Sequence, residues 1–201
     1  MLLQILLVLA VCGAALAATN TTSTCGALSK VSTFVGSGGW GYGYGSINPG
    51  VSHPRGPLRL GPDTTTTALN VNFEHFSGYN YVDDKVRMFS HTHYAGAGIA
   101  GLGNFGMMPV SLSGRDDELS SALKRHNLRE VLTKAHLWSS KFDKATETAS
   151  PGAYSVYLDK PKVQVDLLAT GRLSGMHRYT YTDAPTHAHA QGFVVDVCHS
   201  V

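Results

Sequence analysis

Two histidines, His91 and His93, are the residues of this sequence whose types and spacing most readily suggest chemistry. They stand two positions apart and lead into a glycine-dense segment that includes Gly96 and Gly98. If the chain is extended here, both imidazoles point to the same face, because side chains alternate along a strand. Such a pair can chelate a metal ion, or it can hydrogen-bond the hydroxyls of a small polar molecule.

A metal site would use a second histidine pair, His187 and His189. Four imidazoles could close around zinc or copper. A cupin-like site would add a glutamate shortly after the first pair, but the next glutamate is Glu118. The second pair also lies in a polar turn, which favours solvent-facing side chains at both positions. We therefore predict no metal ligands in this chain.

Other chemistries find less support. The segment from Gly96 to Gly101 matches GxGxxG by letter, but Gly103, Gly106 and Pro109 exclude the helix that a dinucleotide site needs. There is no GxSxG motif, and no carboxylate pair stands out as a general acid and base. The net charge of +2 does not indicate a basic surface of the kind that binds nucleic acid. We predict no catalytic residue and no nucleic-acid partner.

An aromatic loop offers a second candidate site. Trp40, Tyr42 and Tyr44 alternate with glycines in a segment too glycine-rich for a helix. Sugar rings have apolar C–H faces that stack on aromatic side chains, and the glycines allow close approach of the backbone. Two other interpretations stay open: a surface loop without a ligand, or a hydrophobic plug against a neighbouring domain.

The N-terminus indicates the compartment. Residues 1–17 combine an apolar run, Ile5 to Cys12, with the small-x-small cleavage site Ala15-Leu16-Ala17. An uncleaved anchor is the alternative, although the run is shorter than the ~20 residues a span needs. We predict a signal peptide, no membrane contact after its cleavage, and a protein that is secreted or lies in the secretory-pathway or lysosomal lumen.

The segment after the predicted cleavage site agrees with secretion. Asn20 begins a glycosylation sequon. Cys25 and Cys198 are the two cysteines that remain in the mature chain. An oxidising compartment would let them pair, and the alternative is two free thiols.

Hydrophobic periodicity predicts mainly β structure after a polar leader at 18–30. Apolar residues recur at helical spacing only near 116–138, which predicts one inserted helical segment there. A turn is expected at 60–64 and a loop at 96–108. Short strands separated by turns indicate an antiparallel β-sandwich over 31–201, incomplete at its C-terminal end. The expected strands are 31–35, 69–73, 79–82, 85–93, 154–158, 163–167, 177–181 and 192–197.

Taken in order, several short motifs resemble the N-terminal part of the family 92 glycoside hydrolases, which are calcium-dependent exo-α-mannosidases. The resemblance runs collinearly from about Val31 to Val197. The resembling pieces are Phe34–Gly39, Asn48–Gly50, Leu60–Thr64, Ser77–Tyr81, Phe89–His93, Met108–Pro109, Lys141–Asp143, Glu147–Val156, Leu168–Arg172, His177–Tyr181 and Val195–Val197.

The resemblance implies a supersandwich-like β domain that packs on an (α/α) barrel, which this chain lacks. The sandwich would lend loops to a pocket for the mannose of N-glycans, with cleavage of α-1,2 linkages and inversion. The general acid, general base and calcium ligands would come mainly from the barrel, so the chain alone would be inactive. Calcium is expected for the complete enzyme. Trp40, His91 and His93 are expected to face the pocket, with Gly96 and Gly98 allowing close approach of the backbone.

Departures from the family pattern leave sugar specificity open. Trp40, Tyr42 and Tyr44 stand where the family usually has His and Phe, and Arg55-Gly56-Pro57 replaces an apolar turn. Two other classes therefore remain. One is a stand-alone carbohydrate-binding module, which would bind a mannoside without turnover. The other is an inactive fragment, which would expose apolar surface where the barrel should pack.

Overall fold

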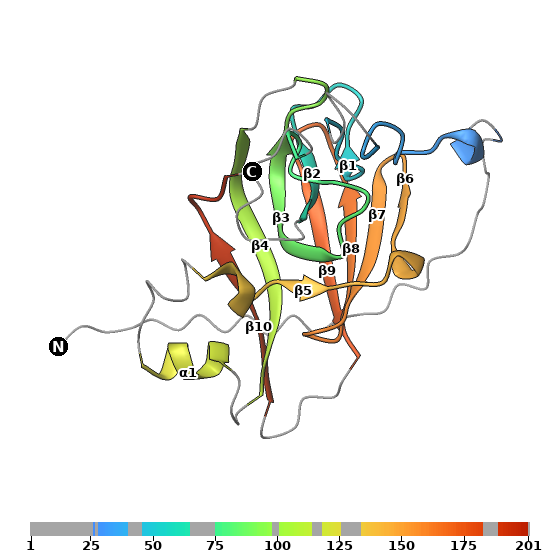
Figure 1. Ribbon diagram of the computed structural model, residues 1–201. Coiled ribbons are helices and arrows are strands. Elements are labelled where there is room, and N and C mark those ends of the chain that lie inside the picture. The colour runs from blue at the N-terminus through green and yellow to red at the C-terminus, as the bar shows by residue number, and fades with distance from the viewer. Residues whose placement is uncertain are drawn as a thin grey trace.

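Two antiparallel β-sheets packed on each other form the molecule (Figure 1). The computed structural model describes residues 26, 28–39, 46–64, 75–97, 101–113, 118–125, 134–182 and 189–200. The strands are β1 Val51–Ser52, β2 Arg59–Thr64, β3 Lys85–His93, β4 Leu102–Ser113, β5 Ser140–Lys141, β6 Thr148–Ser150, β7 Ala153–Leu158, β8 Val163–Ala169, β9 Gly175–Tyr181 and β10 His189–Asp196. The helices are α1 Glu118–Lys124 and the short 3-10 turns η1 Leu28–Lys30, η2 Ala135–Leu137 and η3 Lys144–Thr146.

The larger sheet has six strands. Its order is β1-β2-β3-β4-β10, and β5 also pairs with one end of β3. All of its pairings are antiparallel, and β4 and β10 stay in register over eight residue pairs. This sheet carries both histidines of the His-Thr-His motif, because they end β3.

The smaller sheet is a four-stranded meander in the order β6-β7-β8-β9. Burial alternates along β7 and β8, so that one side chain in two faces the larger sheet. Tyr154, Val156 and Val165 are buried as the period-two pattern predicts. Between the sheets they meet Leu60 and Phe89 of the larger sheet, and together these side chains form one apolar core. The mainly β, antiparallel sandwich predicted from the sequence is confirmed.

Two predicted strands are wrong. Residues 31–35 and 79–82 form turns and irregular chain. The Tyr81 amide donates to the Ser37 carbonyl at 2.8 Å, and the rings of Phe34 and Tyr81 meet edge-on with centroids 5.5 Å apart. Each segment thus packs against the other rather than joining a sheet. The predicted strand at 69–73 lies entirely outside the described residues.

Two strands occupy segments for which the sequence predicts a turn and a loop. In β2, Pro62 has no N–H to donate to a neighbouring strand. Strand β1 pairs only with Arg59 and Leu60, so among the described residues no strand on the β1 side of Pro62 needs a hydrogen bond from it. In β4, Leu102 and Asn104 adopt positive φ angles of 75° and 55°. The β3–β4 register shifts at this point, which lets a glycine-rich segment remain in the sheet.

The described part of the predicted helical segment at 116–138 is helical over two short stretches. Helix α1 covers only Glu118–Lys124, and η2 adds one turn at Ala135–Leu137. Residues 126–133 lie outside the described part of the chain. Within the described residues, no helix has both the length and the apolar character needed to cross a bilayer.

Candidate functional site

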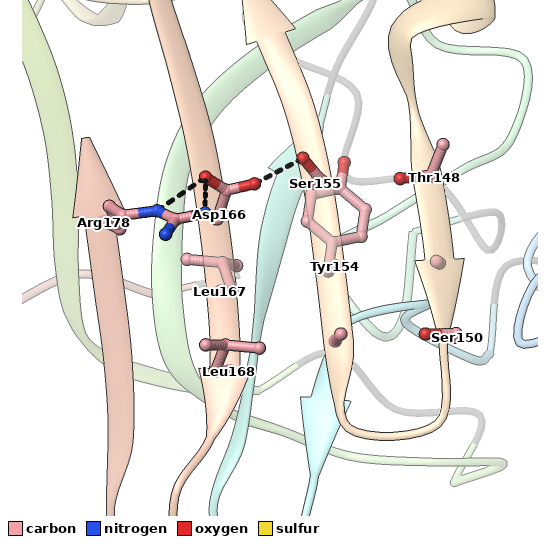
Figure 2. A pocket seen from close by; sticks show the side chains of 10 residues that line it. Thr148, Ser150, Tyr154, Ser155, Asp166, Leu167, Leu168 and Arg178 are labelled. Atoms are coloured by element: carbon pink, nitrogen blue, oxygen red, sulfur yellow. Dashed lines mark hydrogen bonds and ion pairs between the residues drawn. The ribbon is translucent and has the colours of Figure 1, made fainter. Parts of the chain in front are cut away.

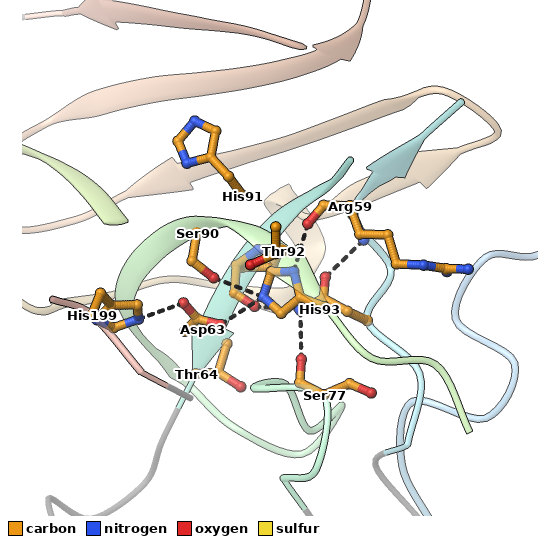
Figure 3. A network of polar contacts seen from close by, with 12 residues as sticks. Arg59, Asp63, Thr64, Ser77, Ser90, His91, Thr92, His93 and His199 are labelled. Carbon is orange, nitrogen blue, oxygen red and sulfur yellow. Dashed lines mark hydrogen bonds and ion pairs between the residues drawn. The ribbon is translucent and has the colours of Figure 1, made fainter. Parts of the chain in front are cut away.

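The His-Thr-His motif places its two imidazoles on opposite faces of the larger sheet. His91 points toward β9 of the smaller sheet, whereas His93 turns to Asp63 on the outer side (Figure 3). The β3–β4 pairing is irregular between Ser90 and Thr92, where β4 carries one residue more than β3. The expectation that both histidines share a face is therefore wrong, because simple alternation does not continue through this irregular end of β3.

His93 lies in a buried, charged network. Its Nδ1 donates to the Arg59 carbonyl at 2.7 Å, and its Nε2 donates to Asp63 Oδ1 at 2.8 Å, with Ser90 Oγ 2.9 Å from the same nitrogen. The carbonyl and the carboxylate can only accept, so the ring must donate from both nitrogens, as an imidazolium does. The side chains of His93 and Asp63 are 1% and 0% exposed, so the pair is shielded from water.

The second oxygen of Asp63 holds the C-terminal segment. Asp63 Oδ2 accepts from His199 Nε2 at 2.8 Å. Burial alone would raise the pKa of Asp63, but the charge of His93 and the hydrogen bonds from His199 and His93 lower it to about 2. A Cβ on Gly106 would lie 2.5 Å from Met88 Sδ and 3.0 Å from His199 Cγ, so only glycine leaves room for the imidazole here.

Three loops meet beside this network. Asn48 Nδ2 donates to the carbonyls of Pro62 and Ser77, at 2.8 and 3.0 Å. Ser77 Oγ donates to the Tyr94 carbonyl at 2.7 Å, at the point where β3 ends. The amide of Gly96, which has a φ of +69°, donates to the Ser46 carbonyl at 2.7 Å. The described residues near 46–48, 77–81 and 94–96 thus converge at one end of the sandwich.

His91 belongs to a different, neutral network between the sheets. Its Nδ1 donates to the Phe105 carbonyl at 2.8 Å, so in the neutral ring Nε2 is an acceptor. His177 Nε2 donates to it at 3.0 Å, and the Tyr179 hydroxyl donates to His177 Nδ1 at 2.9 Å. Burial lowers the pKa of His177 to about 4, with a further contribution from His91. Burial also raises the pKa of Tyr179, and electrostatic repulsion from Tyr181 raises this pKa further by a smaller amount.

A third polar cluster, around Glu147, was not predicted from the sequence. The Glu147 carboxylate accepts from the hydroxyls of Tyr79 at 3.0 Å and Tyr154 at 2.7 Å, and from Lys144 Nζ at 2.8 Å. Burial raises the pKa of both phenols, and the carboxylate raises it further. The cluster fastens the loop at 77–81 to the smaller sheet. Its only sequence signal is the Glu147–Val156 motif that carries part of the family resemblance.

The predicted binding residues are only partly described. His93 is buried, His91 is half-buried, and Gly96 lies in the convergent loops. Trp40 and Gly98 lie outside the described residues, so a sugar-facing role for this set stays a prediction. Ser46, which directly follows the aromatic loop at 40–45, holds Gly96 through its carbonyl.

The other predicted sites stay predictions as well. Asn20 and Cys25 lie outside the described residues, whereas Cys198 is exposed near the end of the chain. His187 is also outside, and the side chain of His189 is not described. Within the described ranges, no group of three or more His, Cys, Asp or Glu side chains could hold a metal ion.

Comparisons with known proteins agree on one family. The model of the glycosyl hydrolase family 92 N-terminal domain matches residues 30–201. A family GH92 α-mannosidase from Bacteroides thetaiotaomicron is 27% identical, with a TM-score of 0.62, over 86% of this chain and 20% of that one. Its complex with mannoimidazole gives 28% identity and a TM-score of 0.56, over 77% of this chain and 18% of that one.

A second solved protein shows the same fold. The GH92 family glycosyl hydrolase ccman5 is 22% identical, with a TM-score of 0.59, over 86% of this chain and 20% of that one. The chain thus spans about a fifth of the length of these solved relatives. No curated protein matches it. The match over residues 30–201 and the shared sandwich show that this chain belongs to the glycosyl hydrolase family 92 N-terminal domain family.

Proposed function

We propose that this chain is the N-terminal domain of a secreted glycoside hydrolase resembling the α-1,2-mannosidases that act on N-glycan mannose. In this proposal its loops contribute to a mannose pocket that an (α/α) barrel outside this chain completes. The family match over residues 30–201, in a chain that covers a fifth of a 27% identical α-mannosidase, is the observation that carries the proposal.

The convergent loops are the candidate contribution to the pocket. Asn48, Ser77 and Gly96 fasten them to one another through backbone carbonyls, so the loops hold their positions without a ligand. Preorganised loops cost little ordering entropy when a ligand binds. Trp40 is the side chain of the predicted set that we propose to contact the sugar, and His93 fixes the base of the loop that begins at Tyr94, whereas His91 faces the smaller sheet.

The catalytic groups and the expected calcium would come from the barrel. The described residues offer no cluster of three or more ligands for a metal ion, so no step of catalysis is assigned to a metal here. Exposed apolar side chains on β10, Phe193 at 58% and Val195 at 38%, support the presence of a further packing surface.

The test is the size and activity of the natural protein. The native secreted product is identified by a peptide from Lys85–His93, deglycosylated and weighed intact. We expect a mass several times that of 201 residues, together with inverting release of mannose from α-1,2-mannobiose. A product of this chain's size that binds methyl α-mannoside without hydrolysis would instead identify a stand-alone carbohydrate-binding module.

A further inference from the structure

The outer face of the smaller sheet carries a hollow that none of the predicted sites includes (Figure 2). Its volume is about 180 Å³. A row of paired residues crosses it, running from Thr148 on β6 through Ser155 and Asp166 to Arg178 on β9. These side chains alternate with the core residues of β7 and β8, so they face away from the larger sheet.

The next row forms the apolar side of the hollow. Ala153 pairs with Ser150 on one side and with Leu168 on the other. The short alanine side chain lies between longer neighbours and so contributes to the depression. Leu168 is 39% exposed and offers an apolar wall. The hollow is smaller than the ~300–1,000 Å³ of sites for drug-sized ligands, so it suits one small ring.

Hydrogen bonds fix the polar side of the hollow. Asp166 Oδ1 accepts from Ser155 Oγ at 2.7 Å, and Asp166 Oδ2 accepts from Arg178 Nε at 3.0 Å. Gln164 Nε2 donates to Ser155 Oγ at 2.7 Å, which orients the serine hydroxyl. The carboxylate is thus held in one orientation at a side-chain exposure of 20%. Arg178 Nη2 also lies 3.0 Å from Asp166 Oδ2, so these three contacts leave one of the roughly four lone-pair positions of the carboxylate, on Oδ1. The Arg178 side chain is exposed, so part of its guanidinium group stays open to solvent.

This arrangement matches the chemistry of a vicinal diol. One hydroxyl can donate to Asp166 while its neighbour accepts from Arg178, and the hydroxyls of Thr148 and Ser150 add further contacts. Asp166 and Arg178 cancel each other's charge, which favours a neutral ligand over an anion. The C–H face of a ring would lie on Ala153 and Leu168.

We propose that this hollow is a surface binding site for a single neutral pyranose, separate from the convergent loops. It would hold a terminal hexose of a glycan, with dissociation in the millimolar range because much of the ring stays in water. The site rests on these residues, whereas the choice of a mannoside as the probe rests on the proposed function.

The test is a titration of the ¹⁵N-labelled chain with methyl α-D-mannopyranoside, followed by backbone amide shifts. We expect saturable shifts at Thr148, Ser155, Asp166 and Arg178. Ala153→Leu fills the hollow, and Asp166→Asn removes the carboxylate acceptor, so each should weaken binding at least tenfold. Thr180→Leu changes the same outer face without lining the hollow and should leave the affinity unchanged.

Several results would each overturn the proposal. The first is an absence of saturable shifts on β6–β9 while the amide spectrum shows a folded chain. The second is an affinity that is undiminished in Ala153→Leu. The third is tighter binding of inorganic phosphate than of the mannoside. A failure of this titration can be distinguished from a failure of the proposed function, because the mass and hydrolysis of the natural protein do not depend on this hollow. Shifts confined to residues 46–48, 77–81 and 94–96 would contradict the hollow and favour the loops.

Discussion

The two histidines of one strand end serve opposite electrostatic roles. His93 donates to acceptors on both sides and forms a buried ion pair with Asp63. His91 lies two residues earlier and joins His177 in a chain of neutral hydrogen bonds between the sheets. The residue type is the same in both places. The partners decide the protonation state, and the face of the sheet decides the partners.

The contrast predicts different responses to losing a partner. Removing the carboxylate from the His93 network leaves a buried cation without its counter-charge. Removing a ring from the His91 network leaves unpaired neutral groups, which is less costly. Substitutions on the two faces of β3 should therefore fall into separate ranges of destabilisation.

The largest expected effect belongs to Asp63→Asn. The amide keeps the shape but not the charge that faces His93 and His199, so we expect a loss of about 3–5 kcal/mol in the free energy of unfolding. Urea denaturation at pH 7 measures it. Asp84→Asn is the control, because Asp84 is 54% exposed and lies 3.6 Å from Lys141 Nζ, a surface pair worth under about 1 kcal/mol. Equal small losses in both variants would show that the buried His93 does not depend on the charge of Asp63.

The next effect is a two-step loss of stability in acid. The pKa of His177 is lowered from 6.5 to about 4, so the unfolded chain binds that proton more readily between these values. Stability should fall by about 2 kcal/mol as the pH falls through this window, after allowance for partial solvent exposure. The pKa of Asp63 is lowered from 3.8 to about 2, so a further ~2 kcal/mol is lost in that lower window.

Substituting His177 isolates the first step. In His177→Gln no group titrates beside His91 and Tyr179, so the slope between about pH 6.5 and 4 should flatten. His136→Gln serves as the control, because His136 is 58% exposed. An unchanged slope in His177→Gln, measured by urea denaturation at each pH, would assign the acid sensitivity elsewhere.

A smaller effect is expected for Gly106→Ala, which crowds only the charged network. The new methyl group would press on Met88 Sδ and on the ring of His199, so we expect a loss of about 1–3 kcal/mol. Gly192→Ala on the neighbouring β10 meets no atom within 4 Å and should be close to neutral. Thermal unfolding of both variants compares them, and similar losses would mean that the space beside His199 is not tightly packed.

The sequence predicts the parts of this fold in which local patterns and packing agree. Strand β3 matches its predicted range, and the period-two burial of β7 and β8 follows from their alternating side chains. Strands β2 and β4 are not predicted, because Pro62, Gly103 and Gly106 are residue types that indicate turns. Their place in the sheet depends on which neighbour pairs with each side, and a single sequence does not encode that locally.

The candidate site is predictable only in part for the same reason. His91 and His93 stand out by spacing, but their partners Asp63, His199 and His177 lie far away along the chain. The two rings point to opposite faces next to the irregular pairing between Ser90 and Thr92, and no local sequence pattern predicts this. Glu147 goes unnoticed because an isolated glutamate carries no signal until its tyrosine partners are known.

The protonation of the rings can be observed directly in ¹⁵N–¹H correlation spectra of the histidine side chains at about pH 5.5. We expect protons on both nitrogens of His93, which faces two acceptors, and a single proton on the ring of His177, whose pKa is lowered to about 4. That result would establish a charged and a neutral network on the two faces of one strand. A neutral ring at His93, or a doubly protonated ring at His177, would contradict it.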